Sequence, residues 1–201
     1  MKLTKLLLRS AFWFSVVIVL PVAGIMAASE AFGWSLNLTT CMPLGLYQRG
    51  QKPKHLKDGD EVFFCPNPNS PAMQLALKER WLEYALGGNW HCQDGLMPFE
   101  KFVVATPGQV VRITRQGIIA NGHLLPNSRV IQSIEDGRIK MIHLPYGRYI
   151  VPIGKFWDYA PGNFAFTSTY YGPVAISRIL GSIHPVPGLT IPGSQFWMKH
   201  A

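Results

Sequence analysis

The chain has 201 residues, of which 48% are hydrophobic and 15% are charged. This length suits one domain with or without an anchor, and the hydrophobic content excludes an intrinsically disordered protein. The formal net charge is +8, from 19 basic and 11 acidic residues. Because the basic residues are scattered singly rather than gathered in a stripe, the sequence predicts no nucleic-acid binding.

The first thirty residues form a separate compositional unit. Lys2, Lys5 and Arg9 precede an uncharged stretch at residues 11–28, and about 17–25 apolar residues are needed to cross a bilayer as a helix. The positive charges predict a cytoplasmic N-terminus and export of the remainder of the chain. Residues 27–29 also fit the cleavage site of a secretory signal peptide, but the apolar stretch exceeds the usual core of about 7–15 residues. We therefore expect an anchor at residues 1–30 and an exported domain at residues 31–201.

The exported part has the pattern of a mainly β domain. Apolar, β-branched or aromatic runs recur between turn signals, which is typical of short strands. The predicted strands are residues 61–65, 102–105, 110–114, 118–120, 139–144, 149–153, 164–167 and 174–179.

One helical insertion, at residues 66–100, interrupts the strands. Ser70 suits an N-cap and Pro71 the first helical position. Apolar residues then follow at helical spacing, and a glycine pair ends the pattern. These positions are Met73, Leu77, Trp81 and Ala85, followed by Gly87 and Gly88.

The three cysteines of the chain are Cys41, Cys65 and Cys92. In an exported domain two are expected to pair. A bridge between Cys65 and Cys92 would staple the insertion to the sheet, and in the chain-entropy model it stabilises by roughly 3 kcal/mol. Cys41 is then the unpaired thiol. It is either a buried structural cysteine or a functional one in a loop shaped by Pro43 and Gly45.

A nucleophilic thiol or alcohol needs a neighbouring base. The six histidines show neither metal-like nor triad-like spacing, so we expect no metal site and no cofactor. Lys101 opens a strand that is apolar on both faces, and burial disfavours the charged form of a lysine. Lys101 is therefore a candidate base, and the alternative is a strand-end lysine whose amine reaches solvent.

Four segments resemble the TraF-type peptidases of conjugative transfer, which are relatives of type I signal peptidases. Residues 37–47 (NLTTCMPLGLY) are similar to the family's N-x-T-x-S-x-P-x-G-L-Y box, and residues 101–109 (KFVVATPGQ) to its K-R-V-V-A-x-P-G-D box. Residues 110–124 resemble the hairpin that comes next in the family, and residues 170–174 (YYGPV) resemble the end of the D-S-R-Y-F-G-P-V box. The resemblance covers nearly the whole chain in the correct order.

The resemblance implies a signal-peptidase-like antiparallel β fold and a single-pass periplasmic peptidase of the bacterial inner membrane. Its expected partners are a pilin precursor, inner-membrane lipid and other proteins of the conjugation apparatus. Cys41 stands where the nucleophilic serine belongs, and Lys101 where the general base belongs. Thr39 stands where a hydroxyl completes the oxyanion hole with the backbone N–H of Cys41.

Three departures from the family pattern matter. The nucleophile is Cys41, and the usual aspartate and arginine on either side of Ser168 are Thr167 and Thr169. Thr167 and Ser168 are expected to support the site, and Thr167 can hydrogen-bond Lys101, but it supplies no carboxylate. An inactive family member that serves as an assembly factor therefore stays an alternative, as does a general leader peptidase.

A cysteine nucleophile changes the expected chemistry. An ordinary thiol titrates near pH 8.5, so Cys41 and Lys101 can form a thiolate–ammonium pair before substrate arrives. Lys101 would then act mainly as the acid that protonates the leaving amine. An acyl thioester favours attack by amines over water more than an oxygen ester does. This preference suits the pilin ring closure associated with some TraF-type enzymes.

Overall fold

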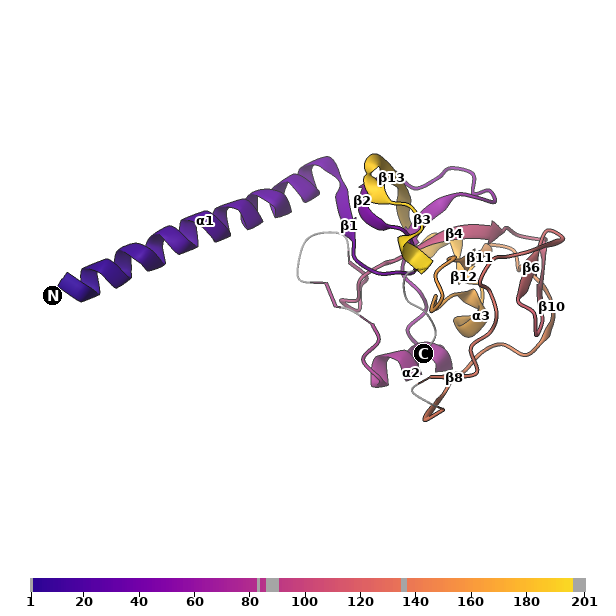
Figure 1. The fold of residues 1–201 in the computed structure, drawn as a ribbon. Helices are drawn as coiled ribbons and strands as arrows, with labels where there is room; N and C mark the ends of the chain where they lie inside the picture. The colour runs from indigo at the N-terminus through magenta and orange to yellow at the C-terminus, as the bar shows by residue number, and fades with distance from the viewer. Residues whose placement is uncertain (1, 83, 86–90, 135–136, 197–201) are drawn as a thin grey trace.

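The computed structural model describes residues 2–82, 84–85, 91–134 and 137–196, and consists of a long N-terminal helix attached to a β domain (Figure 1). Within these residues the largest sheet has seven strands, in the order β1-β2-β13-β3-β4-β11-β12. A four-stranded sheet, β10-β5-β6-β7, and the pair β8-β9 complete the domain, and all pairings are antiparallel. The prediction of a mainly antiparallel β fold is confirmed.

The strands of the seven-stranded sheet are β1 (Trp34–Asn37), β2 (Leu44–Arg49), β3 (Glu61–Phe64), β4 (Phe99–Ala105), β11 (Lys155–Tyr159), β12 (Val174–Ala175) and β13 (Ile179–Ile191). The remaining strands are β5 (Val110–Ile113), β6 (Ile118–Ala120), β7 (His123–Leu124), β8 (Ser133–Ile134), β9 (Ile139–Lys140) and β10 (Gly147–Ile150). The helices are α1 (Lys2–Phe32), α2 (Pro71–Lys78), α3 (Ser168–Tyr171), η1 (Ile176–Arg178) and η2 (Ser194–Phe196).

The predicted strand at residues 164–167 is wrong. The backbone N–H of Ala165 bonds to Gly162 O at 3.2 Å, which closes a turn, and Thr167 is the N-cap of α3. These residues therefore form no ladder with a neighbouring strand. The sequence patterns also did not predict β1, β2, β7, β8, β11 and β13, and β11 contributes to the candidate site.

The helical insertion contains a shorter helix than expected. Ser70 is the N-cap, accepting a hydrogen bond from Met73 N at 3.3 Å, and Pro71 begins α2 as predicted. The helix ends at Lys78 instead of continuing to Ala85, because Arg80 has a left-handed backbone, with φ of 59°. The expected stop at residues 87–88 lies outside the described residues.

The hydrophobic core is made of clusters packed around the two larger sheets. Trp157 and Phe64 are among its largest fully buried side chains. One cluster joins the two sheets, and a second packs around β3, β4 and the start of β13. Their buried members include Ala105, Val111, Ile113, Ile118, Val151 and Trp157 in the first, and Val62, Phe64, Val103, Phe156, Val174 and Ile179 in the second.

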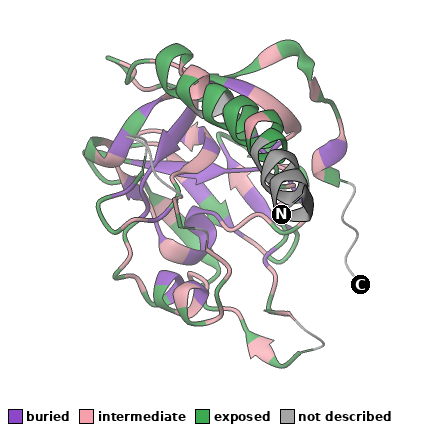
Figure 2. Cartoon of the chain, turned by 90° about the vertical axis from the view of Figure 1, so that its left-hand side faces the viewer, coloured by how far each residue is buried: buried purple, intermediate pink, exposed green. Residues whose placement is uncertain are grey.

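Helix α1 projects away from the β domain (Figure 1), and most of its described side chains are exposed (Figure 2). The segment Trp13–Phe32 has 20 residues and a mean hydropathy of 1.9, which suits a membrane anchor or a signal sequence. Its C-terminal end is held by β2: the Arg49 guanidinium donates to Ser29 O at 2.8 Å, and the Gln48 amide to Phe32 O at 2.6 Å. A cation at a helix C-terminus is also favoured by the helix dipole.

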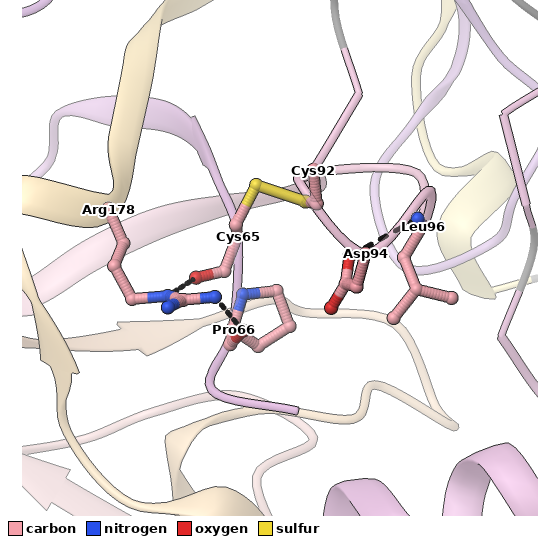
Figure 3. The surroundings of a disulfide bond; sticks show 6 residues. All are labelled: Cys65, Pro66, Cys92, Asp94, Leu96 and Arg178. Atoms are coloured by element: carbon pink, nitrogen blue, oxygen red, sulfur yellow. Dashed lines mark hydrogen bonds between the residues drawn. A yellow bond between two sulfur atoms is a disulfide. The ribbon is translucent and has the colours of Figure 1, made fainter. Parts of the chain in front are cut away.

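A disulfide joins Cys65 and Cys92, as expected, with Cα atoms 5.6 Å apart (Figure 3). Arg178 braces this junction by donating to Cys65 O at 2.6 Å and to Pro66 O at 2.7 Å. Met73 of α2 packs in the same buried cluster as both cysteines. The bridge therefore fixes the insertion against the end of β3.

Candidate active site

Cys41 lies in the loop between β1 and β2, and the side chain of Asn37 organises this loop. The Asn37 amide nitrogen lies 3.0–3.2 Å from the carbonyl oxygens of Thr39, Met42 and Pro43. Its amide oxygen accepts from Thr39 N at 2.9 Å and from Thr39 Oγ1 at 2.8 Å. Asn37 is buried, and its side chain satisfies backbone N–H and C=O groups of the loop that would otherwise bond to water.

The loop is also held from the opposite side by residues that follow β11. Gly162 N–H donates to Cys41 O at 3.1 Å. A Cβ atom at position 162 would lie 2.1 Å from Thr40 O and 2.7 Å from Cys41 Cα, so only glycine fits this approach. The Cys41 thiol is free of any disulfide and half-buried. The sequence pattern predicts this loop but neither of its two restraints.

Lys101 is 5% exposed in the middle of β4. Its Nζ lies 5.8 Å from the centroid of the Phe99 ring, a distance at which the ring face attracts the ammonium group. Side chains alternate along a strand, so Lys101 shares a face with Val103 and Ala105, while Glu100 points to the other face. The expected burial of Lys101 is therefore present in the structure.

Strand β11 adds a carboxylate that the sequence analysis did not predict. Asp158 pairs with Val103 of β4, and the register shifts between Trp157 and Asp158. Such a bulge re-aims a side chain, and here it brings Asp158 to the face of β4 that carries Lys101. Asp158 is fully buried.

Helix α3 supplies the hydrogen-bond donors for this carboxylate (Figure 1 shows α3 beside β11). Ser168 Oγ donates to Asp158 Oδ1 and accepts from Asp158 N at 3.0 Å. Tyr171 donates its hydroxyl proton to Asp158 Oδ2 at 2.8 Å. Both carboxylate oxygens therefore have a donor, as a buried acid requires.

The charges of this cluster influence one another. Burial raises the pKa of Asp158 to about 6, while hydrogen bonds from Ser168 and Tyr171 and the charge of Lys101 oppose the increase. Burial also raises the pKa of Tyr171 well above its usual value, with further contributions from Asp158 and Cys41. Tyr171 therefore stays protonated as a donor, and Cys41, Lys101, Asp158 and Tyr171 form one electrostatic unit. We call these four residues the Cys41 cluster.

The other predicted site residues, Thr39, Ser168 and Thr167, have the following contacts. Thr39 directs its hydroxyl to Asn37. Ser168 supports Asp158, and within the described residues no hydrogen bond joins Thr167 to Lys101. Thr167 lines a small cavity together with Asn127, Arg129 and Thr169.

Two further observations complete the site. Among the described residues, no three His, Cys, Asp or Glu side chains gather as they would around a metal ion. Asp158 was missed because the chain from Lys155 to Tyr159 was not recognised as a strand. The sequence signal was a lone acid between Trp157 and Tyr159, inside an aromatic run.

The known proteins most similar in sequence include several conjugal and plasmid transfer proteins. Conjugal transfer protein TraF of Agrobacterium tumefaciens is 32% identical over 178 residues, covering 89% of this chain and 96% of the relative. Plasmid transfer protein TraF of Escherichia coli is 30% identical over 177 residues, covering 82% and 89%. A signal peptidase I from Enterococcus faecalis superposes with a TM-score of 0.35 and 15% identity, over 64% of this chain and 97% of that one. No protein-family profile matches the chain. The extent and identity of the sequence matches place the chain in the TraF family of conjugal transfer proteins.

Proposed function

We propose that this protein is a peptidase of conjugation, anchored in the bacterial inner membrane by α1, that processes a pilin precursor on the periplasmic side. The observation that supports the proposal is a free thiol, Cys41, in a restrained loop, whose charge acts on Tyr171. Tyr171 donates to the buried carboxylate of Asp158, on which the charge of the buried Lys101 also acts. Perturbed ionisable groups gathered beside a nucleophile are typical of catalytic sites. Family membership supports the role in conjugation.

The proposed reaction uses Cys41 and Lys101. The Cys41 thiolate attacks the scissile carbonyl carbon, and the Lys101 ammonium donates a proton to the leaving amine as the C–N bond breaks. An acyl thioester and a neutral lysine result. A water molecule, or the amino end of the pilin itself, then attacks the thioester while Lys101 takes up its proton. The first route hydrolyses the pilin and the second closes it into a ring.

The oxyanion formed in this reaction needs donors, and we assign them to Thr39 and the backbone N–H of Cys41. In the resting structure the Thr39 hydroxyl donates to Asn37, so it must rotate toward the substrate oxygen when the tetrahedral intermediate forms. Asn37 keeps the backbone of the loop fixed through its other bonds. Losing one oxyanion donor typically costs about 10²–10³ in rate.

The position of β1 supports an extended substrate. β1 ends the order of the seven-stranded sheet, and it leads from α1 directly to the Cys41 loop. Leu36 and Leu38 are exposed there, at 64% and 76%. A precursor segment can add to such an edge as a further strand, with main-chain hydrogen bonds providing affinity. This arrangement would present a membrane-proximal peptide to the thiol.

Mass spectrometry of the pilin tests the proposal. The candidate precursor is co-expressed with the full chain or with Cys41→Ala, Lys101→Ala or Cys41→Ser, and Lys155→Ala serves as the control because Lys155 is exposed on β11. We expect trimmed pilin with wild type and Lys155→Ala, unprocessed precursor with the two alanine variants at the site, and partial trimming with Cys41→Ser. A mature mass lower by one water indicates ring closure.

Two outcomes would contradict the proposal. Equal trimming with all variants would place the cleavage elsewhere and favour the assembly-factor alternative. Accumulation of many unrelated exported precursors with Cys41→Ala would instead indicate a general leader peptidase.

A further inference from the structure

We propose that Asp158 sets the charge state of the Cys41–Lys101 pair by holding Lys101 as an ammonium group. The inference rests on the proposed function and deepens it. Asp158 acts through Lys101 and makes no contact with substrate in this mechanism, so we describe it as a positioning residue.

The sheet register brings the two charged groups together. Asp158 pairs with Val103, and Lys101 lies two residues from Val103 on the same face of β4. Diagonal neighbours of this kind on adjacent strands are typically about 7–8 Å apart. The bulge at Trp157 and Asp158 is what turns the carboxylate toward this face instead of the opposite one.

The donors around Asp158 fix its position without neutralising it. Ser168 and Tyr171 are uncharged donors, and Lys101 is the cation that acts on the carboxylate. Because the pKa of Asp158 is about 6, the group is ionised at neutral pH despite its complete burial. A buried anion is costly unless a cation compensates for it. The charged form of Lys101 supplies this compensation.

The surrounding titratable groups come from three elements. Lys101 lies on β4, Tyr171 on α3 and Cys41 in the β1–β2 loop, and each acts on Asp158 or on its partner Tyr171. Glu100, next to Lys101 on β4, senses the lysine charge from the opposite face of the sheet. Asp158 is therefore the carboxylate of the Cys41 cluster, and it lies on the same face of β4 as Lys101.

A carboxylate in this place suits a cysteine nucleophile. An alcohol needs a neutral lysine to remove its proton, and a nearby anion that keeps the lysine charged would oppose this step. A thiol ionises near pH 8.5 without such help. The lysine can therefore remain an ammonium group until it donates its proton to the leaving amine. Cys41 and Asp158 are, in this mechanism, two features that depend on each other.

Alkylation of Cys41 tests the charge coupling without any substrate. Since Cys65 and Cys92 are bridged, iodoacetamide reports the Cys41 thiolate in the full chain in detergent micelles. Removing a negative charge favours nearby thiolate, so Asp158→Asn should move the midpoint of the rate–pH curve down by about 0.5–1 pH unit. Lys101→Met should move it up. An unchanged midpoint in folded Asp158→Asn would overturn the proposal.

The pH profile of pilin processing tests the same coupling in the reaction. At about 7–8 Å and an effective dielectric constant of 20, loss of the Asp158 charge should shift the alkaline limb down by about 1.5–1.7 pH units. A purely structural role for Asp158 would lower the rate at every pH and leave both limbs in place, which contradicts the proposal. If alkylation shifts but no variant affects processing, the peptidase function fails while the electrostatic role of Asp158 stands.

A matched pair of tyrosines covers the case in which Asp158→Asn does not fold. Tyr171 donates to Asp158, whereas the neighbouring Tyr170 hydroxyl accepts from Ile131 N at 3.1 Å. Tyr171→Phe removes a bond that stabilises the ionised carboxylate, so near pH 7 it should shift alkylation in the same direction as Asp158→Asn, by less. Tyr170→Phe should leave the midpoint unchanged. Equal behaviour of the two variants would overturn the proposal.

Discussion

Strand β4 carries two neighbouring ionisable side chains, Lys101 and Glu100, on opposite faces of one sheet. The buried charges on the two faces have different surroundings. On the Lys101 face, a single carboxylate, Asp158, receives donors from Ser168 and Tyr171 and lies near a cation. On the Glu100 face, two carboxylates lie close to each other: Glu61 of β3 faces Phe102, diagonally across from Glu100. The hydrogen bonds on the Lys101 face hold one carboxylate in place, whereas the two carboxylates on the Glu100 face repel each other when both are ionised.

The Glu100 face shows the cost of this repulsion. Burial and the charge of Glu100 raise the pKa of Glu61 to about 7. Burial raises the pKa of Glu100 too, against the opposing effects of a hydrogen bond from Ser35 and the charges of Lys101 and Arg49. Within the described residues, Glu61 Oε2 is buried without a hydrogen-bond partner. This face therefore lowers stability when its acids ionise, and we assign it no chemistry.

The sharpest test of the comparison replaces each charge of β4 in turn. Lys101→Met removes the amine with little change in volume, and general acid–base groups typically contribute about 10²–10⁴ to a rate. We expect pilin processing, followed by mass spectrometry in a time course, to slow by that factor. Glu100→Gln should leave the rate unchanged, because Glu100 lies on the opposite face of β4 from Lys101. A similar loss in both variants would show that the two faces are not functionally distinct.

A change in the loop that carries Cys41 should give the next largest effect. In Gly162→Ala the new Cβ would lie 2.1 Å from Thr40 O, so the backbone around Cys41 must move. A displacement of about 1 Å at a reacting group can cost about 10² in rate. We expect a loss of this size in processing while the protein still folds, as judged by circular dichroism.

Gly147→Ala is the control for this prediction, because its Cβ meets no atom within 4 Å. Equal activity of the two alanine variants would mean that the contact between Gly162 and the loop does not position Cys41.

The parts of the candidate site that could be predicted are those encoded by short stretches of sequence. Cys41, Lys101 and Thr39 lie in short local boxes, so a sequence pattern can identify them as candidates. The carboxylate on the Lys101 face depends on a bulge in β11 and on its pairing with β4, which no local pattern encodes. The strand itself was missed, and Thr167, predicted to hydrogen-bond Lys101, lines a cavity with Asn127, Arg129 and Thr169.

The fold follows a similar rule. Strands with alternating or continuous apolar runs, such as β4 and β5, were predicted close to their bounds. Helix α2 was predicted from its start signals but ended early at the left-handed Arg80. β13 contains Pro185 and Pro187, which disrupt a regular strand pattern, and its register against β2 shifts after Pro185. Backbone conformations fixed by tertiary contacts thus escaped the sequence analysis.

The disulfide should stabilise the Lys101 face more than the Glu100 face. Phe99 and Tyr171, which contact Lys101 and Asp158, pack against the buried cluster that contains Cys65 and Cys92. We expect the double variant Cys65→Ser/Cys92→Ser to lose about 3 kcal/mol of unfolding free energy in urea titrations. Reduction of the wild type should reproduce the loss, since Cys41 is not bridged. A loss well below 1 kcal/mol would show that packing alone holds the insertion.

The smallest predicted effect is a pH dependence of stability that arises mainly on the Glu100 face. Folding raises the pKa of Glu61 from 4.5 to about 7, and those of Glu100 and Asp158 rise as well. Between about pH 4.5 and 7 the folded state therefore binds more protons than the unfolded state, so the unfolding free energy must fall as pH rises. Glu61→Gln removes one of these contributions. Allowing for its partial exposure, the variant should be about 1 kcal/mol more stable than wild type at pH 8.

The gain in Glu61→Gln should shrink toward pH 4.5, where Glu61 is protonated in the folded protein and the substitution no longer removes a charge. Urea unfolding at several pH values measures this trend. Glu79→Gln is the matched control, since it removes the same charge from a surface pair with Lys78, 3.7 Å away, and such pairs contribute little. A Glu61→Gln variant that is less stable than wild type at pH 8 would mean that the ionised carboxylate is compensated there. The Glu100 face would then resemble the Lys101 face, and the distinction between them would rest on the nucleophile alone.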